Sequence, residues 1–223
     1  MKTLKQHLLT AGLFCVALAL PYRCAAASGQ TLHTTFTGLT ADASFDSTDP
    51  TGCIETSAFI SVTNGTTKMN NVPGSPQASS VAFVAISQFN SCTDTDLVDA
   101  FGSPVLSAGA FQIDKRLNVA TLNASAEAFD LVSNSTVSVQ LNLTWAAIPG
   151  VTPTAFRFTF KQRGGGLRLS DSANATTSEP ATASGSVIAE STNFASGPSD
   201  FADLASMKNG SLTVCIGPCP ATP

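Results

Sequence analysis

The chain has 223 residues, of which 12% are charged and 43% hydrophobic, and its formal net charge is −4. An acidic balance repels phosphate backbones, so nucleic-acid binding is disfavoured. One Trp, one Tyr and two His residues also disfavour sugar-stacking clefts, aromatic hot spots and histidine-based catalysis.

Residues 1–27 have the anatomy of a cleavable secretory signal peptide. A basic head precedes an apolar run from Leu8 to Leu20, and three alanines ending at Ala27 follow. We expect cleavage near Ala27 and a secreted or extracytoplasmic location for a single β domain, residues 28–223. The apolar run is shorter than the roughly 20 residues that a membrane-spanning helix needs, so we expect no transmembrane segment.

Apolar and polar residues alternate with a period of two along much of the chain, which predicts half-buried strands. A first strand contains His33, and the further strands are expected at residues 53–62, 80–89, 120–132, 136–145, 155–161, 167–170, 182–190 and 212–216. Asn64–Gly65 is typical of a hairpin turn and is expected to end the second strand. We expect a loop at Asn70–Pro76 and a hairpin turn at Gly164–Gly166.

Few segments are suited to helix. Only Thr95–Phe101 and Phe201–Met207 are capable of a helical turn or two, Asp171–Thr182 is expected to be an exposed loop, and residues 217–223 form a tail. Strands at regular spacing with short polar turns predict an all-β fold. We expect an antiparallel β-sandwich or barrel with at most one or two short helices.

Four cysteines remain after signal cleavage, and an even number in an exported protein predicts disulfides. Of the three possible pairings we favour Cys53–Cys92 with Cys215–Cys219, because a short turn separates the second pair. Zinc is disfavoured because one His remains and there is no second closely spaced cysteine pair.

The acidic residues offer two candidate sites, each with a simpler explanation. Asp94–Asp99 follows Cys92 and has carboxylates suited to Ca²⁺, but a cap on a short helix explains Asp94 more simply. Glu55 and Glu127 are the best carboxylate pair for glycoside hydrolysis, yet both fall in the polar phase of their strands. We therefore expect no catalytic, cofactor-binding or metal-binding residues, and no cofactor.

Four basic residues lie on the predicted hairpin at residues 155–170, namely Arg157, Lys161, Arg163 and Arg168. On one outer face they would form a surface patch for an acidic protein or cell-surface partner. Solubilising charge is the alternative explanation.

Three segments, Asp49–Thr56, Ala82–Cys92 and Asn118–Asn123, resemble a group of uncharacterised secreted bacterial β-rich proteins with a two-cysteine core. The resemblance implies a bacterial origin and the Cys53–Cys92 bridge, and it brings no known activity. The cysteine spacing is also similar to that of chaperone–usher fimbrial subunits, in which a neighbour's strand completes the sandwich. That likeness implies a donor strand at Ser28–Thr40, although the chain after Cys215 lacks the strand that such subunits offer their chaperone.

These observations together favour a secreted non-enzymatic β domain that acts by surface interaction or binding. A pilin-like or adhesive assembly subunit and a glycoside hydrolase-type secreted enzyme are the alternatives.

Overall fold

A computed structural model describes the backbone of residues 30–69, 77–164 and 167–216, and the side chains of residues 35–68, 77–155 and 177–207. The described residues contain strands, turns and bends but no helix, so the all-β prediction is confirmed. No helix in this part of the chain is long and apolar enough to cross a membrane. The predicted signal peptide, the loop at residues 70–76 and the tail at residues 217–223 lie outside the described residues.

Eleven strands form one antiparallel sheet. They are β1 (Gln30–Thr48), β2 (Ile54–Met69), β3 (Gln77–Asn90), β4 (Thr95–Gly102), β5 (Phe111–Ile113), β6 (Val119–Asp130), β7 (Ser135–Ala147), β8 (Thr154–Gly164), β9 (Leu167–Ala189), β10 (Thr192–Asn193) and β11 (Phe201–Ile216).

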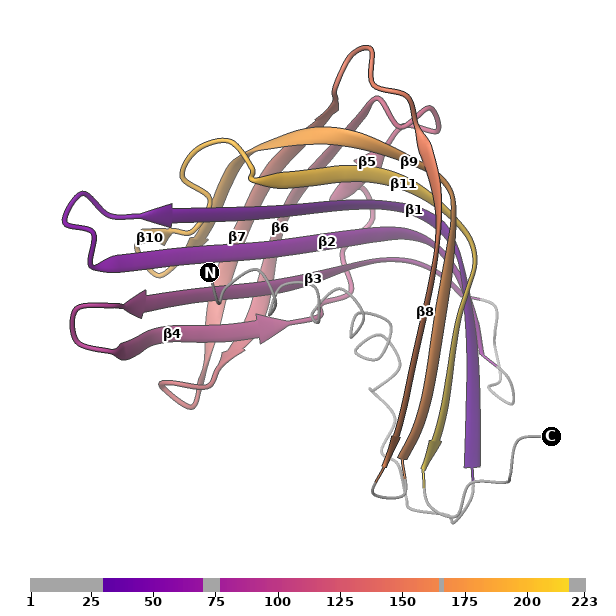
Figure 1. Cartoon of the computed structure of the whole chain (residues 1–223), viewed down its shortest axis with the longest axis horizontal. Helices are drawn as coiled ribbons and strands as arrows, with labels where there is room; N and C mark the ends of the chain where they lie inside the picture. The colour runs from indigo at the N-terminus through magenta and orange to yellow at the C-terminus, as the bar shows by residue number, and fades with distance from the viewer. Residues whose placement is uncertain (1–29, 70–76, 165–166, 217–223) are drawn as a thin grey trace.

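Eight of these strands form a closed circuit. The pairing runs β9–β11–β1–β2–β3–β4–β6–β7, and β7 pairs again with β9. Because the sheet returns to its first strand, its inner face encloses a core. The first half of β9 pairs instead with β8, and Figure 1 shows β8, β9, β11 and β1 curving away from the closed part as an arm.

Mostly small side chains fill the interior of the circuit. Buried alanines come from every strand of the circuit except β7, and the largest fully buried side chains include Trp145, Phe194, Ile60 and Ile86. The β6–β7 hairpin supplies one wall, because its alternate residues face the core, as the sequence pattern predicts. The interior is therefore narrow and closely packed, so that a change of even one methylene group alters its packing.

Trp145 connects opposite walls of this interior. It lies on β7, is completely buried, and donates its indole Nε1–H to the carbonyl oxygen of Asp42 on β1, 2.9 Å away. Its ring meets Phe111 edge-on, with centroids 6.5 Å apart. A buried indole needs such an acceptor, so this bond fixes β7 against β1.

The closing contact between β7 and β9 requires a glycine. Gly185 lies opposite Leu143 and has φ +136°, which side-chain-bearing residues rarely adopt. A Cβ atom there would lie 2.0 Å from the carbonyl oxygen of Asn142. Only glycine lets the two strands approach this closely.

We therefore predict that Gly185→Ala weakens the fold more than an ordinary glycine replacement. The free energy of unfolding should fall by more than about 2 kcal/mol, because backbone strain and a clash combine. Gly109→Ala is the matched control, since Gly109 also has a positive φ but open space around it. Urea unfolding of both variants makes the comparison, and equal losses would contradict the role of Gly185 in closure.

Three segments differ from their predicted structure. Thr95–Phe101 forms β4 and Phe201–Met207 begins β11, where short helices were expected, and Asp171–Thr182 is part of β9 and not a loop. Each segment has a neighbouring strand to pair with, β3 for the first, β1 for the second and β11 for the third. Long-range pairing overrides their weak local preferences.

The predicted turn at Asn64–Gly65 is also wrong, because β2 continues to Met69. Gly65 lies opposite Gly38 of β1, and a Cβ on Gly65 would meet the carbonyl oxygen of Thr37 at 2.4 Å and the ring of Phe36 at 2.8 Å. An aromatic ring over facing glycines is a known way to stabilise a sheet. The strands on either side of the predicted hairpin turn at Gly164–Gly166 pair as expected, with Gly164 opposite Leu167, while residues 165–166 lie outside the described residues.

The disulfide between Cys53 and Cys92 is confirmed, with the Cα atoms 5.2 Å apart. It joins the residue before β2 to the turn after β3, and Ser91 N–H donates to the Cys53 carbonyl beside it. Cys219 lies outside the described residues, so the Cys215–Cys219 bridge stays a prediction.

Removal of the Cys53–Cys92 bridge should lower the free energy of unfolding by roughly 3–4 kcal/mol, because the unfolded chain regains the entropy of a 39-residue separation. The measurement is denaturant unfolding of Cys53→Ser/Cys92→Ser beside reduced wild-type protein. A loss below about 1 kcal/mol in both would show that strand pairing alone holds this end of the sheet.

Candidate functional site

Two rows of residues cross the outer face of the circuit, opposite the core. The register places the members of each row directly across from one another on neighbouring strands. The aromatic row consists of Phe201, Ser44, Phe59, Ala85, Phe101 and Phe129, from β11 to β6. The carboxyl row, two positions along the strands, consists of Asp203, Asp42, Ser61 and Phe83.

Phenylalanines at both ends of the aromatic row are open to solvent. Phe201 is 53% exposed, Phe101 46% and Phe129 41%. In the middle of the face, the rings of Phe59 and Phe83 lie 6.5 Å apart in a tilted arrangement. Large apolar side chains gathered on one exposed face are a mark of interaction surfaces.

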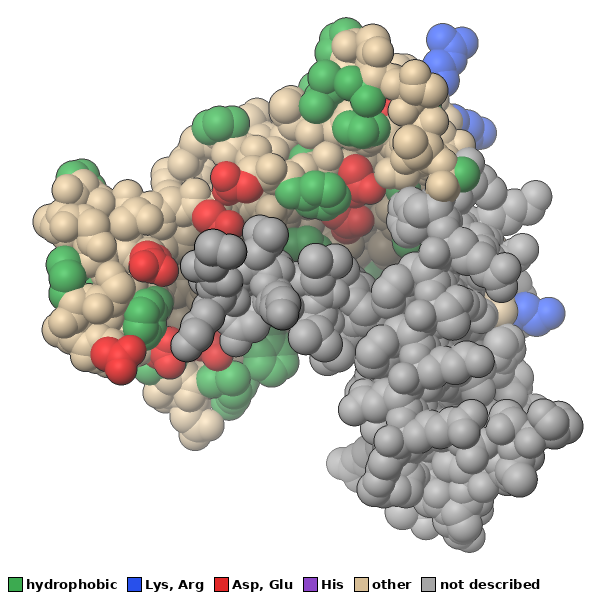
Figure 2. Space-filling view, viewed as in Figure 1, with side chains coloured by type: hydrophobic (Ala, Val, Ile, Leu, Met, Phe, Trp, Pro, Cys, Tyr) green, Lys and Arg blue, Asp and Glu red, His purple; other side chains and the backbone are tan. Residues whose placement is uncertain are grey.

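Five of the eleven exposed large apolar side chains of the described residues lie on β4, at the end of β6 and in the β6–β7 turn. We term this group the apolar patch, and it consists of Leu97, Phe101, Phe129, Leu131 and Val132. Leu131 N–H donates to the Asp99 carbonyl at 2.8 Å, which ties the turn to β4. Figure 2 shows hydrophobic and acidic side chains side by side in this region.

Asp130 positions the apolar patch. Its Oδ1 accepts hydrogen bonds from the N–H groups of Asp99 (3.0 Å) and Val132 (3.2 Å), and its Oδ2 accepts from Ser133 N–H (3.1 Å). Asp130 is only 4% exposed. Burial alone would raise the pKa of Asp130, but a hydrogen bond from the Ser133 hydroxyl and these backbone hydrogen bonds outweigh it and hold the pKa below its usual range.

The rim of the patch is acidic. Asp99 precedes Phe101 by two positions and shares its face of β4, and Asp96 lies on the same strand. Partial burial, with the negative charges of Asp96 and Asp130, raises the pKa of Asp99. No Lys or Arg occurs between residues 117 and 147 or between residues 77 and 114, so these strands offer no charge to neutralise the rim.

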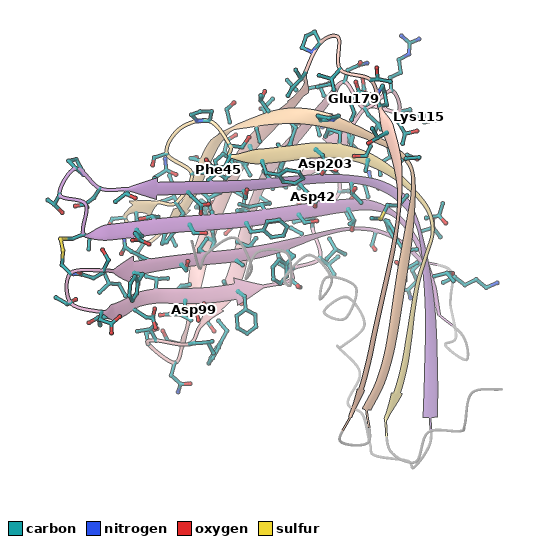
Figure 3. All side chains as sticks on the ribbon, viewed as in Figure 1. Asp42, Phe45, Asp99, Lys115, Glu179 and Asp203 are labelled. Atoms are coloured by element: carbon teal, nitrogen blue, oxygen red, sulfur yellow. A yellow bond between two sulfur atoms is a disulfide. The ribbon has the colours of Figure 1, made fainter. Side chains whose placement is uncertain are left out.

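The carboxyl row brings two acids together. Asp42 and Asp203 lie directly opposite each other on β1 and β11, as Figure 3 shows. Ser178 Oγ donates to Asp203 Oδ2 at 3.0 Å, and the Ser61 hydroxyl donates to Asp42. The Oδ1 atoms of both carboxyls are buried and have no hydrogen-bond donor in the described structure.

Burial, followed by the charge of Asp203, raises the pKa of Asp42 to about 8. Burial also raises the pKa of Asp203, against the opposing effect of hydrogen bonds from Ser178 and Asp42. No described Lys or Arg contributes to the pKa shift of Asp42 or to that of Asp203. Perturbed pKa values cluster at functional sites, which makes this pair a candidate site.

The carboxylates considered from the sequence do not form a site. Glu55 and Glu127 are both exposed, as predicted, and they lie on β2 and β6, which β3 and β4 separate. Asp94 caps no helix, because it occupies the turn before β4 with φ 55°. Among the described residues, no group of three or more His, Cys, Asp or Glu side chains forms a metal site.

The four basic residues lie on the arm, outside the residues whose side chains are described. Arg157, Lys161 and Arg163 occupy alternate positions of β8, and Arg163 lies opposite Arg168 of β9. Within the described residues β8 pairs with β9 alone, and basic residues at such positions commonly protect an edge strand from unwanted pairing.

Sequence reasoning missed the carboxyl row and the apolar patch. Asp42 alternates with Ala41 and Ala43, a pattern that also describes a solvent-facing strand residue. Its proximity to Asp203 depends on a register between distant strands. The sequence did contain a signal for the apolar patch, because phenylalanines such as Phe101 and Phe129 occupy strand positions whose alternate neighbours face the core.

No protein-family model, curated protein or solved structure matches the chain. The candidate sites therefore stand on geometry and chemistry alone.

Replacing Asp130 with Ala should lower the free energy of unfolding by about 2–3 kcal/mol at pH 7, because three backbone N–H groups lose a charged acceptor. The folded-state pKa lies below the unfolded value of 3.8, so this stabilisation is present above pH 4 and is lost as pH falls through the folded-state pKa. Urea unfolding of both proteins from pH 7 to pH 2 should show the difference shrinking below pH 4. Asp96→Asn is the control, and a constant difference down to pH 2 would contradict the assignment.

Proposed function

We propose that the protein is an extracytoplasmic binding protein that holds a positively charged, apolar segment of a partner protein on the apolar patch. The observation that carries this proposal is the coincidence of five exposed apolar side chains with an acidic rim. The patch supplies area to bury, and the rim supplies charge complementarity and orientation.

The residues of the patch favour a protein segment over a sugar. Phe101 and Phe129 are apolar and offer no hydrogen-bonding group, whereas carbohydrate sites rely on Trp and Tyr with polar edges. The partner must then supply apolar side chains, and Asp96 and Asp99 favour Lys or Arg beside them. Asp130 holds the β4 end and the turn in fixed positions, so little ordering is required on binding.

Location outside the cytoplasm is part of the proposal. The Cys53–Cys92 disulfide is compatible with an oxidising compartment, and the first 27 residues have the pattern of a secretory signal.

The two alternative functions receive less support. A glycoside hydrolase needs paired carboxyls facing one substrate, and Glu55 and Glu127 lie on separated strands. A donor-strand subunit needs a free N-terminal strand, but β1 pairs with β11 along one edge and β2 along the other. Assembly through another surface remains an outcome of the test below.

The test measures fluorescence anisotropy with three labelled peptides: one alternating Lys and Leu, one alternating Glu and Leu, and one alternating Lys and Ser. The Lys–Leu peptide should bind. The double variant Phe101→Thr/Phe129→Thr should weaken its binding about tenfold or more, which corresponds to about 1.4 kcal/mol. Asp99→Asn should weaken binding of the same peptide by less than the double variant does.

Val119→Thr is the matched control, because Val119 is a similarly exposed apolar residue of β6 outside the patch. Equal binding of the three peptides, or equal weakening by the control, would contradict the proposal. A dimer in size-exclusion chromatography that Phe101→Thr/Phe129→Thr dissociates would show instead that a second copy of the chain occupies the patch.

A further inference from the structure

Three buried oxygen atoms on the outer face have no hydrogen-bond partner in the described structure. They are Oδ1 of Asp42, Oδ1 of Asp203 and Oγ1 of Thr40. Thr40 is only 2% exposed and precedes Asp42 by two positions on β1, so the two residues share a face. A buried polar atom without a partner costs free energy and calls for an explanation.

The register brings these atoms into one neighbourhood. Asp203 lies opposite Asp42, and Ala205 lies opposite Thr40, so Thr40 is a diagonal neighbour of Asp203. On the other side Ser61 lies opposite Asp42, and its side chain is also buried. The group therefore contains two carboxyls and two hydroxyls from three adjacent strands.

A proton shared by the two carboxyls would satisfy only part of this group. It would join Asp42 and Asp203 but leave Thr40 Oγ1 without a partner. A divalent cation between the carboxyls would neutralise both charges and would also take the Thr40 oxygen as a ligand. The strands that surround the group, β2, β1, β11 and β9, contribute Ser61, Thr40 and Ser178. The one Lys or Arg of these strands whose side chain is described, Lys68, lies opposite Thr35, seven positions along β1 from Asp42, too far away to take the place of a cation.

We infer that Asp42, Asp203 and Thr40 bind a divalent hard cation of the size of Ca²⁺ on the outer face. Every donor is oxygen, which hard cations require, and Ca²⁺ tolerates irregular geometry where Mg²⁺ demands an octahedron. Asp42 and Asp203 keep partial exposure as residues, which gives water molecules access to complete the coordination. The site is independent of the proposed partner at the apolar patch.

Trp145 provides a direct test. It is the single Trp of the chain, and its Nε1 lies 2.9 Å from the carbonyl oxygen of Asp42. Terbium(III), which takes oxygen ligands as Ca²⁺ does, should therefore luminesce when Trp145 is excited in chelator-treated full-length protein. Added Ca²⁺ should quench this luminescence by competition and raise the melting temperature.

The variants separate ligation from folding. Asp42→Asn and Asp203→Asn should lose terbium luminescence at least tenfold while still folding, as circular dichroism will show, because Asn removes the charge and keeps the shape. Thr40→Val should weaken binding several-fold, and Thr40→Ser should restore it. Asp46→Asn, an exposed acid on the same face of β1, should bind as the wild type does.

Three outcomes would overturn the inference. They are the absence of both luminescence and calcium stabilisation in the folded wild type, calcium stabilisation that persists in both Asp→Asn variants, and unchanged binding in Thr40→Val. The first outcome would leave a proton shared by the two carboxyls, which removes one of their two charges, as the alternative.

Discussion

The antiparallel pairing of β7 with β9 is the contact on which the rest of the structure depends. Without it the sheet would have two open edges and an apolar face exposed to water. With it, alternate residues of eight strands face one enclosed core, and the other alternate residues share an outer face. The close approach at Gly185 and the small interior side chains are consequences of this closure.

Because the sheet is closed, one residue, Asp42, makes contacts on both the core side and the outer face. Asp42 accepts the Trp145 indole N–H through its backbone carbonyl on the core side and presents its carboxyl to Asp203 on the outer side. The packing of Trp145 therefore holds the strand that carries the carboxyl. The apolar patch, at the other end of the outer face, is held differently, through the buried Asp130 at the end of β6.

The sequence was sufficient wherever structure depends on near neighbours. Alternation predicted the β6–β7 hairpin, and the Cys53–Cys92 bridge was anticipated. It was insufficient wherever a distant strand decides the outcome. Asn64–Gly65 has the composition of a turn, but Gly38 and Phe36 determine its extended conformation. The Asp42–Asp203 pair has no local signature at all, because it arises from the register between the first and last strands.

Hydrogen exchange of the backbone amides in β9 tests closure most directly. In the segment Ala181–Ala189, alternate amides face β7. The outer edge of β8 serves as the reference for unpaired amides, because β8 pairs with β9 alone among the described residues. The account predicts that the β7-facing amides exchange as slowly as those of β2, which is paired on both edges. Exchange as fast as that at the outer edge of β8 would show that the circuit is open and would contradict the account.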